Sequence, residues 1–319
     1  MLQYSDSGAT ISHFNSPPIF FSGYNVNELL TPKQVSRAID VSESSIKRWC
    51  DKGEIPTHYT AGGHRRIALS TVLNLVREGK HRLVNPEALG LPATSGQSFR
   101  VVERARESLT EAILAGNEAR CRQLIIDLFL AEHNVGTICD EVIAESFVEI
   151  GDRWSCGDVE VYQERRGCEI VLRIMRELRS LLPAVDEQAL LAMGGAPSGD
   201  QYSLGTSMVE VVLRDAKWNA VSLGDNLPFC TMDAAIRRHR PQLFWLSCSH
   251  IENQASFLEG YNTLYTEFNT DVAFVVGGRA LTEELTRQMK FSAWCSSMQH
   301  LEGFAQTLRL ALTQREKCS

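Results

Sequence analysis

TPKQVSRAIDVSESSIKRWCDKGEIPTHYTAGGHRRI, residues 31–67, holds the clearest local folding signals in this chain of 319 residues. Thr31 can cap a helix that opens with a proline, and Gln34 can close a capping box on it. Ser42 can cap a second helix, which Gly53 would end. Two short helices joined by a tight turn predict a helix-turn-helix.

A hairpin with a basic second strand is expected directly after the two helices. Residues 55–60 give its first strand, Gly62 and Gly63 its turn, and residues 64–67 its second strand. A third helix, capped by Ser70, would then close a small apolar core. Together the three helices and the hairpin predict a winged helix-turn-helix, with the hairpin as the wing.

Positive charge is concentrated in this part of the chain. Residues 28–82 carry ten Lys and Arg against six Asp and Glu, whereas the whole chain has a net charge of -7. A helix in the major groove of DNA needs short polar and cationic side chains, and a wing needs cations for phosphate oxygens. A solvated basic helix beside a surface hairpin is the alternative, but it leaves the order of these elements unexplained. The predicted DNA contacts are Ser44, Ser45, Lys47, Arg48, Tyr59, His64, Arg65 and Arg66.

The segment from residue 29 to about residue 80 resembles the winged helix-turn-helix domain of MerR-type transcriptional regulators. The resemblance lies in the pattern TPKQVSRAIDVSESSIKRWCDKGEIP, followed by GGHRRI. It implies sequence-specific binding to a double-stranded DNA operator. It also implies that copies of the chain assemble with one another, as a dimer or a tetramer.

Composition argues against several other classes of protein. The apolar runs are shorter than the ~20 residues that span a bilayer, and the polar N-terminus lacks the basic and apolar regions of a secretion signal. The nine cysteines are an odd number without a CxxC pair, which argues against a disulfide scaffold and a zinc site. We therefore expect a cytoplasmic protein with reduced thiols and no membrane partner.

Turn-forming and helix-breaking residues divide the chain into segments. The predicted division is a flexible N-terminal segment at 1–27, the DNA-binding domain at 28–82, a linker at 83–100, a helical bundle at 101–183 and an α/β domain at 187–319. Apolar residues in the bundle segment recur at intervals of three and four, which predicts four helices with core-facing stripes. Those helices are expected at 101–115, 118–131, 137–154 and 159–182.

Five short apolar runs alternate with helical patterns in the last segment. They begin at Leu190, Ala220, Leu243, Val272 and Phe291. This alternation predicts a Rossmann-like, doubly wound parallel sheet, whose ligands bind in the loops that follow the strands. Those loops contain glycines, which let a flat or phosphate-bearing ligand approach closely, and serines, which offer hydrogen bonds.

The order of these loops resembles the cobalamin-binding domain of methionine synthase, methylmalonyl-CoA mutase and the light-sensing MerR-type repressors. That family has Asp/Glu-x-His-x-x-Gly, then Ser-x-Leu/Ser/Thr, then Gly-Gly. The preceding bundle resembles the cap of those proteins, whose Trp and Glu cover the upper face of the corrin. The resemblance implies nine cofactor-binding residues here, namely Trp154, Glu164, Asp200, Tyr202, Gly205, Ser247, Ser249, Gly277 and Gly278.

Two positions depart from the family. Tyr202 stands where the family has the histidine that binds cobalt from below, and Arg165 stands where the cap has a second histidine. A phenol with a pKa of about 10 is a poor cobalt ligand at neutral pH, whereas a neutral imidazole is a good one. Asp200, which orients the histidine in the family, is expected to hydrogen-bond to the Tyr202 hydroxyl, and His250 is a second histidine to consider. The cleft is therefore predicted to hold cobalamin, another tetrapyrrole or no ligand, in that order.

The predicted architecture is multidomain, with a winged helix-turn-helix, a four-helix cap bundle and an α/β Rossmann-like domain. The predicted function is a transcriptional regulator, not an enzyme, which acts as a repressor and responds to the occupant of the cleft. One alternative is a ligand-independent regulator with a degenerate cobalamin-like domain. Another is a corrinoid carrier enzyme, which would leave the winged module unexplained.

Overall fold

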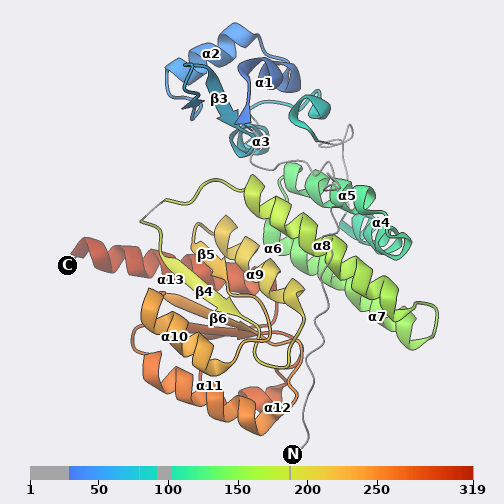
Figure 1. Cartoon of the computed structure of the whole chain (residues 1–319), viewed down its shortest axis with the longest axis vertical. Coiled ribbons are helices and arrows are strands. Elements are labelled where there is room, and N and C mark those ends of the chain that lie inside the picture. Colours follow the sequence, from blue (N-terminus) through green and yellow to red (C-terminus); the bar gives the residue numbers. More distant parts are fainter. Residues whose placement is uncertain (1–28, 79, 92–101, 187, 319) are drawn as a thin grey trace, which may run out of the picture.

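The protein is described by a computed structural model over residues 29–78, 80–91, 102–186 and 188–318 (Figure 1). The predicted N-terminal segment, 1–27, and the second half of the predicted linker, 92–100, lie outside the described residues. Figure 1 shows the N-terminal domain at one end, the helical bundle beside it and the parallel sheet with its helices at the other end. Among the described helices, none is long and apolar enough to cross a membrane.

The N-terminal domain has the predicted winged helix-turn-helix architecture. Its elements are β1 (Leu29–Leu30), α1 (Pro32–Ile39), α2 (Glu43–Asp51), β2 (His58–Tyr59), β3 (Arg65–Ala68) and α3 (Leu69–Arg77). The three strands form an antiparallel sheet in the order β1-β3-β2, so β2 and β3 make the wing. Thr31 and Gln34 form the expected capping box, and the Ser42 hydroxyl accepts a bond from the Ser45 amide.

The predicted cap of the third helix is wrong. The N-cap of α3 is Ala68, which has no side-chain bond to offer, and Ser70 lies inside the first turn. The reason is that β3 runs directly into α3, because Ile67 and Leu69 are both buried in the same small core. The packing of these two residues sets the start of the helix more strongly than a serine hydroxyl can.

The start of the predicted linker is folded onto the N-terminal domain. Residues 83–91 contain a short 3-10 helix, η1 (Pro86–Leu89), and the amides of Val84 and Asn85 donate to the carbonyl of Ala38 at 2.7 and 3.0 Å. Leu83, Leu89 and Leu91 are buried. The packed N-terminal domain therefore continues to about residue 91.

The helical bundle follows the predicted spacing. Its elements are α4 (Val102–Ala115), α5 (Glu118–Leu130), α6 (Val135–Thr137), η2 (Ile138–Ala144), α7 (Glu145–Ser155) and α8 (Val161–Leu181). The helix that we expected to be continuous over 137–154 contains the π-helical turn η2. Such a turn widens the helix locally and is often found at a functional site.

The C-terminal domain is the predicted parallel sheet with helices on both faces. Its elements are β4 (Leu191–Gly195), α9 (Ser203–Asp215), β5 (Asn219–Ser222), α10 (Phe229–His239), β6 (Leu243–Ser247), α11 (Gln254–Phe268), β7 (Ala273–Gly277), α12 (Glu283–Thr286), β8 (Ala293–Cys295) and α13 (Met298–Cys318). All strand pairs are parallel, in the order β5-β4-β6-β7-β8. The order reverses at β4, between β5 and β6, and a ligand crevice is expected at such a point.

Alternate residues of the central strand supply two separate cores. Leu243 and Trp245 of β6 belong to the core shared with α9, α13 and the helical bundle, whereas Phe244 and Leu246 belong to the core under α10 and α11. Side chains of a strand point alternately to the two faces, so one strand serves both layers. The helical bundle therefore lies on the α9 face of the sheet, where Figure 1 shows α8 beside α9.

Arg77, the last residue of α3, joins the N-terminal domain to the rest of the molecule. Its guanidinium carbon lies 3.9 Å from the centroid of the Phe129 ring in α5, and Nη1 lies 3.9 Å from Oδ1 of Asp215 at the end of α9. Burial lowers the pKa of Arg77, which Asp215 partly offsets. A single half-buried side chain thus touches all three parts of the chain.

Candidate functional site

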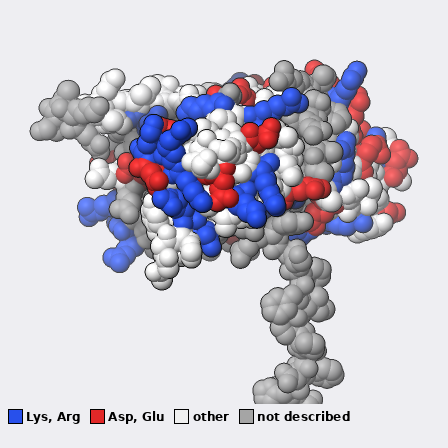
Figure 2. Space-filling model, turned by 90° about the horizontal axis from the view of Figure 1, so that it is seen from above, with Lys and Arg blue, Asp and Glu red and all other residues white. Residues whose placement is uncertain are grey.

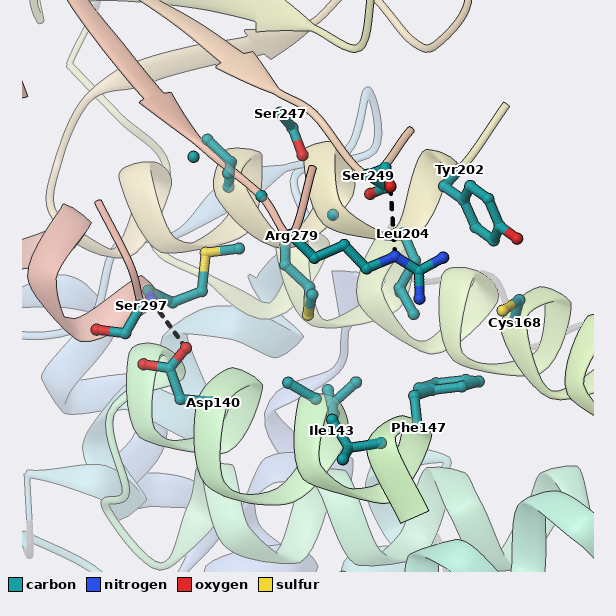
Figure 3. Close-up of a pocket in the computed structure, with 18 of the residues that line it drawn as sticks. Asp140, Ile143, Phe147, Cys168, Tyr202, Leu204, Ser247, Ser249, Arg279 and Ser297 are labelled. Atoms are coloured by element: carbon teal, nitrogen blue, oxygen red, sulfur yellow. Dashed lines mark hydrogen bonds between the residues drawn. The ribbon is translucent and has the colours of Figure 1, made fainter. Parts of the chain in front are cut away.

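A cavity of about 810 Å³ lies between the cap bundle, which we define as α4–α8, and the carboxyl ends of the sheet strands. Its walls come from η2, α7 and the start of α8 on one side, and from the ends of β6, β7 and β8 with the start of α9 on the other. Figure 3 shows Ile143 and Phe147 of the bundle facing Leu204, Arg279 and Ser249 of the sheet domain. The cavity therefore lies at the carboxyl ends of the strands, where a doubly wound sheet is expected to bind its ligand.

Eight of the nine predicted cofactor residues line this cavity. They are Trp154, Glu164, Tyr202, Gly205, Ser247, Ser249, Gly277 and Gly278. They come from α7, α8, the start of α9 and the loops after β6 and β7, so the fold gathers residues that are distant in sequence. The ninth, Asp200, lies behind the cavity wall and is completely buried.

Asp200 holds two loops together, which differs from its predicted role. Oδ1 accepts from the amide of Tyr202 at 3.0 Å, and Oδ2 accepts from the amides of Ser249 and His250 at 2.5 and 3.1 Å. The expected bond to the Tyr202 hydroxyl is not formed, because the carboxylate is already engaged by these three backbone donors. Charge-assisted bonds of this kind are strong when buried. Asp200 therefore fixes the loop after β4 against the loop after β6.

The ring of Tyr202 lies between the two walls of the cavity. The guanidinium carbon of Arg165, on the cap, is 4.9 Å from its centroid, and that of Arg279, after β7, is 5.1 Å away. Arg279 also donates from Nε to the carbonyl of Ser249 at 3.3 Å, as Figure 3 shows. Cations over an aromatic face are attracted to it. Tyr202 thus links the cap to the sheet domain by ring contacts.

The opposite end of the cavity is closed by Asp140 of the π-helical turn. Its carboxylate accepts from the amides of Met298 and Gln299 at 2.7 and 2.9 Å, at the N-terminus of α13. A carboxylate at a helix N-terminus is favoured by the unsatisfied amides and by the helix dipole. Sequence reasoning missed this residue, because a helix predicted as regular gives no reason to single out one acid on it.

Two glycines of the sheet domain lie where a Cβ atom would clash with neighbouring atoms. A Cβ at position 205 would lie 2.7 Å from Oγ of Ser247, which is closer than such atoms can approach. Gly278 has φ +109, and a Cβ there would lie 2.3 Å from the carbonyl oxygen of Cys248. Both positions therefore exclude larger side chains, and the chain backbone is exposed to whatever occupies the cavity.

No histidine is among the described residues that line the cavity. His250, the second histidine considered from the sequence, is exposed and lies outside the cavity. Cys168 does line the cavity, but burial, reinforced by Glu164, raises the pKa of its thiol to about 11. The thiol is therefore protonated at neutral pH, and a thiol is a poor metal ligand compared with a thiolate.

These residues fit part of what a corrinoid needs. The apolar cap wall and the glycine and serine loops suit a flat ring with a tail beside β6 and β7. The same residues offer no imidazole to cobalt, because the described lining contains a phenol, that of Tyr202, and no histidine. A tetrapyrrole would be held here by its faces and its edge groups.

The side chain of Trp154 is placed where it could stack on a tetrapyrrole ring. It lines the cavity and yet is 55% exposed. We expect Trp154→Ala to change the free energy of unfolding by less than about 0.5 kcal/mol, because little burial is lost. If a tetrapyrrole stacks on this side chain, the same change should weaken its binding about tenfold, measured by titration of the absorption spectrum. Unchanged affinity would show that the ring lies elsewhere.

The predicted DNA-contacting residues lie on α2 and on the hairpin of β2 and β3 in the N-terminal domain. Ser44, Lys47, Arg48, Tyr59 and His64 are exposed. Figure 2, which views the molecule from the side of this domain, shows Lys and Arg gathered there with acidic residues among them. An exposed basic face on an acidic chain is typical of a nucleic-acid-binding surface.

Two of these cations are already paired. Arg65 donates from Nε and Nη2 to Oδ1 of Asp51 at 3.1 and 2.6 Å, and Nζ of Lys47 lies 2.7 Å from Oε1 of Glu43. Both pairs are at the surface, where such pairs contribute little to stability. Ser45 lies half-buried with its hydroxyl 2.9 Å from that of Ser42, so it stabilises the start of α2. Arg66, next to Arg65 on the wing, is half-buried.

Comparisons with known proteins match two separate segments of the chain. A family described as a helix-turn-helix domain matches residues 29–80, and one described as a B12 binding domain matches residues 105–179, which lie in the cap bundle. The chain therefore combines a helix-turn-helix match with a B12-binding-domain match over the cap helices, and the parallel sheet follows the second match. No curated protein sequence matches the chain.

Among solved structures, the monomethylamine corrinoid protein of Methanosarcina barkeri is similar with a TM-score of 0.56 and 16% sequence identity, over 65% of this chain and 100% of that chain. At this identity the likeness shows the fold alone. A cobalamin-binding protein of Desulfitobacterium hafniense has a TM-score of 0.34 and 15% identity, over 67% of this chain and 98% of that chain. The methanol:cobalamin methyltransferase complex of M. barkeri has a TM-score of 0.36 and 14% identity, over 69% and 85%.

Proposed function

We propose that this chain is a MerR-type transcriptional regulator whose affinity for a double-stranded DNA operator is set by a tetrapyrrole, cobalamin in the first place. The ligand would bind between the cap bundle and the Rossmann-like domain. In this proposal the protein is a cytoplasmic repressor without enzymatic activity, and it binds its operator as a dimer or tetramer. Residues 28–82 bind DNA, 101–183 form the cap and 187–319 complete the ligand domain.

The proposal rests on one arrangement. The chain carries both a basic winged module and a cavity of about 810 Å³, and Arg77 of the module contacts α5 and the end of α9. The cavity has the place and lining expected of a tetrapyrrole site in this fold, and the family matches point the same way. A ligand that changes the cap or α9 would act on the elements that hold the DNA-binding domain. This is the arrangement that coupling between two sites requires.

The proposal is tested with the full chain and DNA. Repeated selection from random double-stranded DNA should enrich one sequence, and the affinity for it should change at least tenfold when hydroxocobalamin is added in the dark. Fluorescence anisotropy measures both, and an absorption spectrum of the separated protein reports pigment binding. Failure to select a sequence above random DNA would overturn the regulatory function.

A second function has one observation in its favour, which is the fold shared with the monomethylamine corrinoid protein. A corrinoid carrier would bind cobalamin and exchange a methyl group with a partner enzyme. DNA binding would then be absent while pigment binding is present. A ligand-independent regulator would give the opposite pair of results, with DNA binding and no pigment.

Tyr202→His tests the meaning of the altered position. The substitution restores the family's Asp-x-His-x-x-Gly pattern on a loop that Asp200 already holds. We expect cobalamin affinity to rise about tenfold, or the lower ligand to change to the new imidazole. Electron paramagnetic resonance of the cobalt(II) form with ¹⁵N-labelled histidine would detect that nitrogen.

Tyr202→Phe is the matched control, since it keeps the ring between the two guanidiniums and adds no nitrogen. It should bind cobalamin as the unaltered protein does. If Tyr202→His takes up no corrinoid at all, more than the cobalt ligand differs from the family, and cobalamin is not the occupant.

A further inference from the structure

Three sources of positive potential meet around Tyr202. Two are the guanidiniums of Arg165 and Arg279, whose carbons lie 4.9 and 5.1 Å from the ring centroid. The third is the N-terminus of the 13-residue helix α9, which has Tyr202 as its N-cap, no side-chain cap and no acidic residue in its first turn. Leu204 and Gly205, in that first turn, line the cavity together with both arginines.

Neither guanidinium is neutralised by the protein. Within the described residues, neither Arg165 nor Arg279 forms an ion pair with a carboxylate. Arg279 uses Nε for the Ser249 carbonyl, so its two terminal nitrogens have no bond to a described residue. Both side chains are exposed to solvent, so their mutual repulsion is screened, and an anion placed between them would be attracted to both.

The acids near this cavity have other positions or partners. Asp200 is engaged by three backbone amides, and Asp140 is bound to the amides at the start of α13 at the far end of the cavity. Asp152 and Glu164 line the cavity on the cap side without pairing to either guanidinium. Asp225 accepts from the Ser203 hydroxyl at the start of α9, and Glu164 directly precedes Arg165 on α8. Among the described residues, no carboxylate forms an ion pair with Arg165 or Arg279, so the charge of both guanidiniums is left for a ligand.

We propose that Arg165, Arg279 and the N-terminus of α9 form a binding site for an anionic group of the ligand. Arginine binds carboxylate or phosphate oxygens through two parallel bonds, and a helix N-terminus adds amide donors to the same anion. The site lies where the family places a cobalt ligand, so this chain holds its tetrapyrrole by charge at the edge of the ring. The anion is either a carboxylate side chain of the ring or the phosphate of a nucleotide tail. This inference rests on the proposed tetrapyrrole site and names the chemistry that selects its ligand.

Two pairs of ligands separate these sources. Protoporphyrin IX carries two carboxylates and its dimethyl ester carries none, whereas cobalamin carries a phosphate that cobinamide lacks. Binding to the full chain is measured by quenching of tryptophan fluorescence and by absorption. In at least one pair, we expect the member that carries the anionic group (the anionic member) to bind about tenfold more tightly than the member that lacks it (the neutral member), and that pair identifies the anion.

The double variant Arg165→Gln, Arg279→Gln should remove that difference by weakening the anionic member about tenfold and leaving the neutral member unchanged. Arg176→Gln is the matched control, since Arg176 is exposed on the same helix and does not line the cavity. Circular dichroism checks that the variants remain folded. Equal binding of both members of each pair, equal weakening of both by the double variant, or no binding of any of the four would each overturn the inference.

These outcomes are independent of the proposed regulation by DNA. Operator binding is measured on the same protein without any tetrapyrrole, so it can persist when the anion site fails. Conversely, charge-dependent ligand binding without operator binding would leave the anion site intact and remove the regulatory function.

Discussion

Asp200→Ala is expected to lower the free energy of unfolding by about 3 kcal/mol, the largest effect on stability among the changes considered for this site. The reason is that one buried carboxylate accepts from the amides of Tyr202, Ser249 and His250, and its removal leaves three donors without their acceptor. Urea denaturation followed by circular dichroism measures the change.

Asp200→Asn is the matched comparison for this prediction. The amide keeps the volume and one acceptor oxygen, but its NH₂ group would face backbone donors, so its effect should be smaller than that of alanine and still destabilising. The loss should be accompanied by weaker tetrapyrrole binding, because the loops after β4 and β6 both line the cavity. A loss below about 1 kcal/mol for Asp200→Ala would mean that water replaces the carboxylate easily.

Replacing both wing arginines, Arg65→Ala and Arg66→Ala, is expected to weaken operator binding about 100-fold at moderate salt. If each contacts a phosphate, the slope of log affinity against log salt should fall by roughly 0.9 for each contact. Asp51 lowers the contribution of Arg65 to DNA affinity, because Arg65 is already paired with this carboxylate before DNA binds. Anisotropy titrations at several salt concentrations give both quantities.

The double change Arg176→Ala, Arg287→Ala controls for loss of charge alone. Both residues are exposed and lie outside the winged domain, in α8 and after α12. Their removal should leave operator affinity within about twofold, because charges beyond a Debye length of ~8 Å are screened. Unaltered affinity and salt dependence in the wing variant would show that Arg65 and Arg66 of β3 do not contact DNA.

Local signals predicted most of the fold. Thr31 and Gln34 act within three residues of each other, so their capping box could be inferred without knowing what surrounds it. The five strands were also predicted, because buried parallel strands form short continuous apolar runs. The prediction of Ser70 as a helix cap was wrong for the opposite reason, because the start of α3 depends on the core in which Leu69 is buried.

The sequence predicted which loops surround the candidate site. It did not predict which side chains contact one another there. The resemblance named Tyr202 and the glycines, which line one cavity, and their contact with a cofactor stays a prediction. It gave no indication that Arg165 and Arg279 approach the same ring, because their meeting depends on how the cap packs on the sheet domain. For the same reason the role of Asp200 as an acceptor for two loops was missed.

The helix α9 has a consequence for how far a change at the cavity must travel. Its first turn lines the cavity and its last residue, Asp215, meets Arg77 of the winged domain, so one element runs the whole way. Thirteen residues at about 1.5 Å each make a rod about 20 Å long. A tilt of such a rod by a few degrees moves its far end by about 1 Å, which is enough to break a contact at 3.9 Å. A movement at the cavity could therefore reach the winged domain through α9 alone, without a series of intermediate side chains, because this helix contacts both.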